Sequence, residues 1–202
     1  LAIRIAIVGA ESTGTTTLSK ALAHTYQQRG GVWSRTAYIP EYGREYTQTK
    51  LAVKKAQNAH FSIAALPWYN EEFLRIAQQQ TYLEGIAIQY GAPLLICDTN
   101  SFATTLWHQR YVGAPYAELD AFVKAHPPPS LYLLTDIQGV AFEQDGLRDG
   151  EHIREQMHSS FIEKLSTQEA PWHLISGTPE ARVEQACLHI DRAIQKKWHF
   201  TD

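Results

Sequence analysis

Near its amino end the chain passes from an apolar run, residues 3–8, into the segment Gly-Ala-Glu-Ser-Thr-Gly-Thr-Thr-Thr at residues 9–17. An unbroken apolar run predicts a buried strand, and the residues from 15 onward have helical spacing. A strand that turns through two glycines into a helix collects backbone N–H groups at the positive end of that helix. Residues 9–17 therefore predict a phosphate-binding loop in an α/β fold, and we call them the phosphate loop.

The phosphate loop follows the pattern G-x-x-x-x-G-K-[ST] except at the lysine, which Thr15 replaces. Gly9 and Gly14 have the required spacing, and Thr16 occupies the hydroxyl position that ligates Mg²⁺. A substitute for the missing ammonium group is expected from an arginine elsewhere in the chain. A plain strand-to-helix turn, capped by its threonines, is the alternative interpretation. The residues predicted to contact a nucleotide are Gly9, Glu11, Ser12, Thr13, Gly14, Thr15, Thr16 and Thr17.

The rest of the chain alternates apolar β-rich runs with helical patterns, which is typical of a parallel sheet with helices on both faces. Strands are predicted over residues 3–8, 36–40, 94–97, 131–134 and 172–176, and helices over 15–29, 116–126, 151–165 and 179–198, besides a polar helical stretch after residue 98. Between about residues 52 and 90 the pattern is helical, and Pro67 suits a helix start or a break. No repeat or linker divides the chain, so one α/β domain spanning all 202 residues is expected.

Ligands of open α/β sheets bind beyond the carboxyl ends of the strands. Glu41 follows the second predicted strand and is a candidate general base for a substrate hydroxyl, while Arg44 suits bidentate contact with a phosphate or carboxylate. Asp98 follows the third strand, where P-loop enzymes carry the acidic residue that anchors Mg²⁺. A solvated turn around Glu41 and Arg44, and ordinary strand-end chemistry at Asp98, are the alternatives.

A polar segment after the fourth strand predicts a lid, residues 143–154. Arg148 lies between Gly146 and Gly150, and Arg154 follows one or two helical turns later. Glycine-flanked arginines suit a loop that closes over a triphosphate and excludes water. A polar surface loop is the alternative. Five aromatic residues are candidates either for stacking on a flat substrate or for ordinary packing: Trp68, Tyr69, Trp107, Tyr111 and Tyr116.

The net charge and the composition of the chain limit the kinds of molecule that it is expected to bind. The formal net charge of −3 provides no broad cationic field for nucleic acid or an anionic membrane. Two cysteines, Cys97 and Cys187, make neither a disulfide framework nor a metal cluster. No apolar run approaches the ~20 residues that span a bilayer. We therefore expect a cytoplasmic protein with small-molecule ligands, and its oligomeric state is not set by the sequence.

Taken together, these segments resemble the ribosylnicotinamide kinase domain of the NadR type, a P-loop kinase family. The matching strings are Gly-Ala-Glu-Ser-Thr-Gly at 9–14, Glu-Tyr-Gly-Arg-Glu at 41–45, Asp-Thr-Asn at 98–100 continuing through Thr104 and Thr105, and Asp-Gly-Leu-Arg at 145–148. The resemblance implies a P-loop NTPase fold with a five-stranded parallel sheet and a short lid. It implies Mg-ATP as donor and nicotinamide riboside as acceptor, in NAD biosynthesis.

The roles expected on this basis are catalytic for Glu41, Asp98, Arg148 and Arg44, phosphate-binding for Arg154, and metal-ligating for Thr16 and Asp98. Family members are often fused to a nucleotidyltransferase, but this chain has no His-x-Gly-His string, so a stand-alone kinase domain is expected. Two alternatives stay open: a nucleotide-binding regulatory module without turnover, suggested by Thr15, and a kinase of another nucleoside or nucleotide.

Overall fold

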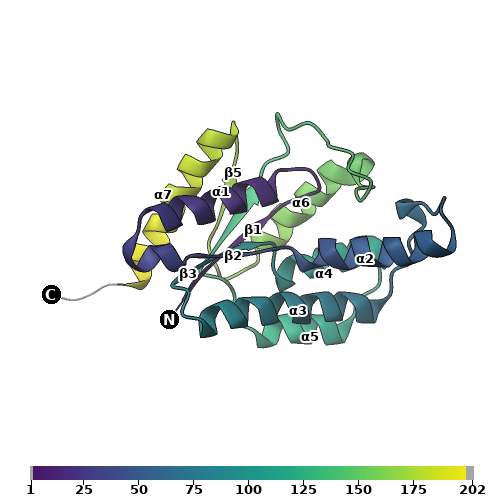
Figure 1. Ribbon diagram of the computed structural model, residues 1–202, viewed down its shortest axis with the longest axis horizontal. Helices are drawn as coiled ribbons and strands as arrows, with labels where there is room; N and C mark the ends of the chain where they lie inside the picture. Colours follow the sequence, from purple (N-terminus) through teal and green to yellow (C-terminus); the bar gives the residue numbers. More distant parts are fainter. Residues whose placement is uncertain (1, 199–202) are drawn as a thin grey trace.

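Five parallel strands in the order β2-β3-β1-β4-β5 form the centre of the fold (Figure 1). The structure is a computed structural model and describes residues 2–198. The strands are β1 (Ile3–Val8), β2 (Ala37–Ile39), β3 (Leu94–Asp98), β4 (Leu131–Thr135) and β5 (Trp172–Ile175). The predicted five-stranded parallel sheet is confirmed, because every neighbouring pair runs parallel, with Ile5 opposite Ile96 on one side and Leu131 on the other.

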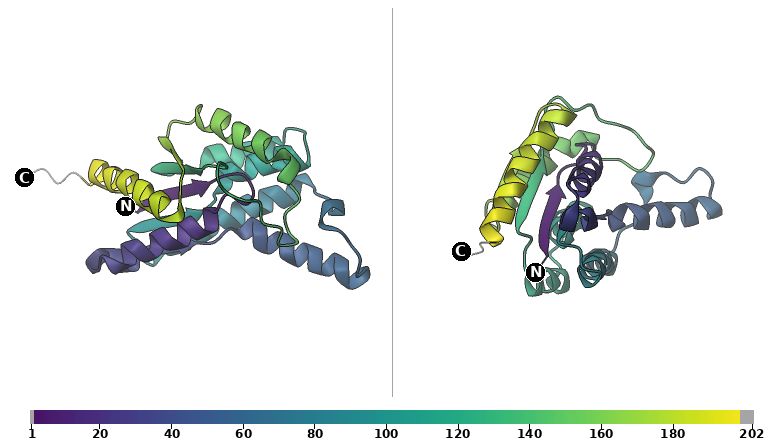
Figure 2. Two further views of the ribbon diagram at one scale, coloured as in Figure 1. Left: turned by 90° about the horizontal axis from the view of Figure 1, so that it is seen from above. Right: turned by 60° about the vertical axis from the view of Figure 1, so that its left-hand side comes forward.

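Helices cover both faces of the sheet, as predicted. They are α1 (Thr15–Gln28), α2 (Tyr42–Gln57), α3 (Asn70–Gln89), α4 (Ser101–Tyr111), α5 (Ala117–Ala125), α6 (Arg154–Leu165) and α7 (Pro179–Lys197). Figure 2 shows α1 and α7 together on one side of the sheet, where they share a hydrophobic core with β1. Helices α4 and α6 share the core of the other face, α3 covers the sheet beside them, and α5 packs against α3.

The central strand β1 explains why its sequence is apolar throughout. Its odd-numbered residues, including Ile5 and Ile7, pack against α1 and α7, whereas Ala6 and Val8 face α4 and α6. Both faces of a parallel strand are therefore buried, and an alternating polar pattern would leave polar groups in the core. The phosphate loop follows directly from this rigid strand.

The helical pattern predicted between about residues 52 and 90, with Pro67 as a start or a break, corresponds to two helices, the first of which begins ten residues earlier than predicted, at Tyr42. These helices are α2 and α3, separated by residues 58–69. Asn58 leaves the helical conformation at the end of α2, and α3 begins with a capping box in which Glu72 accepts from the backbone N–H of Tyr69. This capping outweighs the apolar periodicity that runs through the segment. Glu41 consequently stands directly before α2, with Arg44 in its first turn.

Strand order places the end of β1 at a switch point. The chain moves from β1 towards β3 and β2 on one side, and towards β4 and β5 on the other. Crevices for ligands form at the carboxyl ends of strands at such points. The long segment between β4 and α6, residues 136–150, runs over this end of the sheet (Figure 1). No helix within residues 2–198 is long and apolar enough to cross a membrane.

Candidate active site

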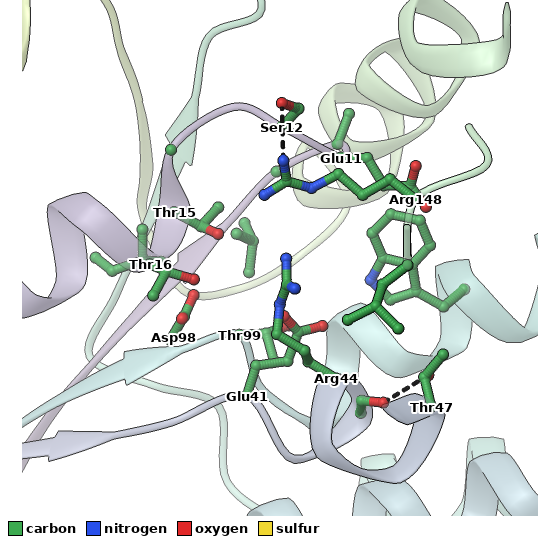
Figure 3. A pocket seen from close by; sticks show the side chains of 18 of the residues that line it. Glu11, Ser12, Thr15, Thr16, Glu41, Arg44, Thr47, Asp98, Thr99 and Arg148 are labelled. Carbon is green, nitrogen blue, oxygen red and sulfur yellow. Dashed lines mark hydrogen bonds between the residues drawn. The ribbon is translucent and has the colours of Figure 1, made fainter. Parts of the chain in front are cut away.

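A cavity of about 240 Å³ opens at the carboxyl ends of β1 and β3, between the phosphate loop, the start of α2 and the lid (Figure 3). The predicted site residues that line it are Gly9, Glu11, Ser12, Gly14, Thr15, Thr16, Thr17, Glu41, Arg44, Asp98 and Arg148. Two predicted residues, Thr13 and Arg154, are not among its lining. Residues far apart in the sequence thus meet around one space.

The phosphate loop has the backbone of an anion cradle. Ser12 and Gly14 both adopt left-handed conformations, with φ of 59° and 82°. Gly9 has no room for a side chain, because a Cβ there would collide with the hydroxyl groups of Thr135 and Thr13. Gly14 is the N-cap of α1, and no side chain caps this helix. The alternative of a turn capped by threonines is therefore wrong, and the first N–H groups of α1 are available to a ligand.

Asp98 and Thr16 fit the requirements of a magnesium site. The Asp98 side chain is 1% exposed, and its Oδ2 accepts a hydrogen bond of 3.3 Å from Tyr38. Its other carboxylate oxygen, Oδ1, is buried and accepts no hydrogen bond from the described residues. Burial raises the pKa of Asp98, and the nearby hydroxyl groups of Thr16 and Thr15 oppose that rise. A buried carboxylate oxygen beside a hydroxyl is the oxygen-rich environment that Mg²⁺ prefers.

Glu41 points into the same cavity as Asp98 (Figure 3). Burial, and then the neighbouring charge of Asp98, raise the pKa of Glu41 to about 7, while Arg44 lowers it. A carboxyl group with this pKa is partly ionised at neutral pH, and its ionised form is a stronger base than an ordinary carboxylate, so it accepts a proton from a substrate more readily. Gln80 on α3 fixes the turn that carries Glu41, because it accepts from the Tyr42 N–H at 2.9 Å and donates to the Pro40 carbonyl at 3.2 Å.

Two of the predicted arginines connect the lid with the rest of the cavity. Arg44 donates to Asp145 Oδ2 from both terminal nitrogens, at 2.8 and 2.9 Å. Arg148 reaches across the opening and donates to the Ser12 hydroxyl at 3.3 Å and to the Glu143 carbonyl at 2.8 Å (Figure 3). Both guanidinium groups are therefore at the cavity and are held by protein oxygens at its rim.

Glu11 turns away from the centre of the phosphate loop. It accepts hydrogen bonds from Arg110 of α4 at 2.7 Å and from the Gly150 N–H at 2.8 Å. Arg110 also pairs with Asp149, and Tyr111 donates to the same carboxylate at 3.0 Å. This network joins the phosphate loop, α4 and the carboxyl end of the lid.

Arg154 and Thr13 lie behind the loop. Arg154 donates to the Ser12 carbonyl at 2.9 Å and to the Val140 carbonyl at 2.8 Å. The Thr13 hydroxyl packs beneath the loop, bonded to the Ala10 carbonyl at 2.8 Å and to Thr135 at 2.6 Å. Sequence reasoning missed Arg182 of α7, which donates to the carbonyls of Thr13 (2.7 Å), Asp136 (3.0 Å) and Gly177 (2.9 Å).

Aromatic side chains form part of the cavity lining. Trp68 and Tyr111, with ring centroids 5.3 Å apart, line the cavity together with Trp107. Tyr69 and Tyr116, also considered as stacking candidates, are not part of the lining. The lining also contains residues that no motif predicted, among them Thr47 of α2, Val140 and Ala141. Phe73, Ile76 and Gln80, which were not predicted either, come from one face of α3.

Comparisons with known proteins show a family and similar folds. The chain matches the family described as an AAA domain over residues 4–182. No curated protein sequence matches it. Thymidylate kinase from Ehrlichia chaffeensis has a similar structure, with 14% identity, a TM-score of 0.62, and coverage of 93% of this chain and 98% of the other.

Two structures of NadR protein are also similar. The one in complex with NAD and AMP-PNP has 15% identity and a TM-score of 0.63, and the one in complex with NR has 16% and 0.65. Both matches cover all of this chain but only 51% and 53% of the NadR chains, so this chain spans about half of their length. At such identities the likeness establishes the fold, which is that of P-loop kinase-like proteins.

Proposed function

Because the chain belongs to the AAA domain family and has the fold of P-loop kinases, we propose that it is a phosphotransferase that uses Mg-ATP to phosphorylate nicotinamide riboside to nicotinamide mononucleotide. The observation that carries this proposal is the meeting of Glu41 with Asp98 and Thr16 in one cavity below an open phosphate loop. These groups are a proton acceptor, a set of oxygen ligands and a cradle for an anion, which are what phosphoryl transfer to a hydroxyl requires.

In this reaction the substrate hydroxyl oxygen bonds to the γ-phosphorus of ATP as the bond to the bridging oxygen of ADP breaks. Glu41 accepts the hydroxyl proton, and the backbone N–H groups of the phosphate loop bind the phosphate oxygens. Thr16 and Asp98 would hold Mg²⁺, which offsets phosphate charge when bound. Arg44 and Arg148, at the rim, would exchange their protein partners for phosphate oxygens as the lid closes.

The choice of nicotinamide riboside rests on three observations. The segments that resemble the NadR type, around residues 9–14, 41–45 and 98–105, all contribute residues to the cavity. One of the similar NadR structures is a complex with NR. The flat walls made by Trp68 and Tyr111 suit a planar cationic ring. We infer that residues 1–202 act as one kinase domain, with residues 143–154 as its lid.

A direct assay tests the proposal. Purified protein with Mg-ATP is offered nicotinamide riboside and, separately, a panel of other nucleosides and thymidine monophosphate, and products are identified by mass spectrometry. We expect nicotinamide mononucleotide as the main product. Asp98→Ala should lower its rate of formation by at least ~100-fold, the scale of a single electrostatic group in catalysis. Preferred phosphorylation of another acceptor would refute nicotinamide riboside as the substrate but would still support kinase activity.

A regulatory module that binds nucleotide without turnover is the second candidate, and the observation that favours it is Thr15 at the lysine position. Tight ATP binding with no transfer to any acceptor of the panel would select this candidate. The retention of Glu41 in a site that raises its pKa to about 7 favours the kinase, because a module that only binds nucleotide needs no proton acceptor.

A further inference from the structure

The phosphate loop is held from its outer side by two arginines that come from distant parts of the chain. Arg154, in the first turn of α6, binds the Ser12 carbonyl, and Arg182, in the first turn of α7, binds the Thr13 carbonyl. Neither side chain lines the cavity. Both therefore act on the loop from behind, through its peptide groups.

Peptide geometry converts these contacts into an orientation of the loop. In a planar trans peptide the carbonyl and the following N–H point in opposite directions. When guanidinium groups hold the carbonyls of Ser12 and Thr13 on the outer side, the N–H groups of Thr13 and Gly14 point towards the inner side. A hydrogen bond to a carbonyl also polarises its peptide unit, so each of these N–H groups becomes a stronger donor to an anion.

Among residues 2–198 neither arginine forms a salt bridge, although Asp136 lies near Arg182 and Glu151 lies near Arg154. Two other arginines, the partly buried Arg4 and Arg110, form salt bridges with Glu84 and Glu11. Arg182 is 6% exposed and bonds only to carbonyl oxygens, and Nε of Arg154 is buried without a partner. Burial lowers the pKa of both groups, and the charges of Glu151 and Asp136 only partly oppose that fall at Arg154 and Arg182 respectively. A buried cation without a paired anion is costly, and an anion bound nearby reduces that cost.

We propose that Arg154 and Arg182 supply, from behind the phosphate loop, the positive charge that Thr15 does not provide, and that both are positioning residues for a bound triphosphate. The proposal rests on the proposed function only in requiring that the loop binds a triphosphate. It explains how the cradle can lack the lysine and still favour a highly charged ligand, because two fixed cations lie one peptide group away from the donors.

Calorimetric titration with inorganic triphosphate and Mg²⁺ tests this role without any nucleoside. Arg182→Gln should weaken binding by about 10-fold or more, the loss expected for one charge-assisted hydrogen bond. Thr15→Lys added to this variant should restore most of the affinity, because the charge returns at the other side of the loop. In the otherwise natural chain, Thr15→Lys should change the affinity by less than about 10-fold, since the charge is already present.

A matched control separates charge supply from simple stabilisation. Arg4 also donates to two backbone carbonyls, those of Pro127 and Pro128, at the opposite end of the sheet. The double variant Arg4→Gln, Glu84→Gln removes a partly buried guanidinium without leaving its partner charged and unpaired. It should lower the melting temperature and leave triphosphate affinity unchanged. Arg182→Lys keeps the charge but loses the planar fork that binds three carbonyls, so it should keep more affinity than Arg182→Gln.

The outcomes are distinct. Unchanged affinity in Arg182→Gln, or a weakened affinity that Thr15→Lys does not restore, would overturn the proposal. If Arg182→Gln does not fold, Arg154→Gln is decisive by the same two criteria. If the natural protein binds no triphosphate at all, the proposed function fails together with this inference. Binding that behaves as expected, with no phosphorylation of nicotinamide riboside, would sustain the inference and refute the proposed function alone.

Discussion

Glu41 illustrates how one residue obtains its chemistry from its surroundings. Burial and Asp98 together raise its pKa to about 7, so it is protonated at acidic pH and can act as a base only above that range. We predict that kcat/KM for the nucleoside rises about 10-fold per pH unit below pH ~7 and reaches a plateau above it. Glu41→Gln should lower kcat by at least ~100-fold and abolish this rise. A flat profile in the natural protein would remove Glu41 from the proton transfer.

The same shift of pKa affects stability. The folded state binds a proton at Glu41 more tightly than the unfolded state, so this group stabilises the protein below its unfolded pKa, and that contribution is lost as pH rises to about 7. Glu41→Gln should therefore be more stable than the natural protein at about pH 8, by about 1–3 kcal/mol, the lower value allowing for partial exposure. The difference should vanish near pH 4, as urea denaturation at both pH values would show.

At this scale the sequence identified residues with a fixed position relative to a strand. Thr16, Glu41 and Asp98 were predicted because a strand end and a glycine spacing locate them, and all three line the cavity. Gln80 and Arg182 could not be predicted in the same way. Each is a single polar residue within an amphipathic helix, and only the tertiary fold brings it to a carbonyl or an N–H near the site.

The lid, as an element, is fixed at its carboxyl end by close packing. Gly150 has an ordinary negative φ, but a Cβ there would lie 2.7 Å from Glu11 Oε2 and 2.8 Å from both terminal nitrogens of Arg110. We predict that Gly150→Ala lowers the free energy of unfolding by about 1–3 kcal/mol by overpacking. It should also weaken triphosphate binding, because Glu11 belongs to the phosphate loop. Urea denaturation and calorimetry measure the two effects.

Gly85 provides a control for this substitution. It lies within α3, and a Cβ there would meet no atom within 4 Å. Gly85→Ala should leave triphosphate binding unchanged and stabilise the protein by about 0.5–1 kcal/mol, because alanine restricts the unfolded chain. Equal effects of the two substitutions would show that the network of Glu11, Arg110 and Gly150 has no special part in holding the lid.

The strands were predictable as elements, whereas the bounds of α2 and α3 were not. Each strand is a short apolar run bounded by turn residues, and such runs belong to a buried parallel sheet whatever their partners are. The division between α2 and α3 depends instead on the capping of α3 by Glu72 and on the pairing of Glu72 with Lys50 of α2, at 2.6 Å. Those contacts link residues across the loop, so local periodicity does not reveal them.

The whole molecule should respond to nucleotide through mass action. A ligand at 100 times its dissociation constant stabilises the folded state by about 2.7 kcal/mol. For a domain of this length that raises the melting temperature by roughly 5–10 °C. We predict such a rise with Mg-ATP and a much smaller one with adenosine at equal concentration, since the phosphate loop binds the triphosphate. Equal shifts with both ligands would indicate that the base alone is recognised.

The hydrogen bonds from Arg154 to Ser12 and from Arg182 to Thr13 join residues that are 142 and 169 positions apart in the sequence. The conformation of the nine-residue loop therefore depends on contacts from outside the loop. Grafting these nine residues into another scaffold would transfer the sequence but not its anion-binding conformation, unless the two helices that carry the arginines were grafted as well. A protein designer who wished to dispense with the lysine would begin from those helices.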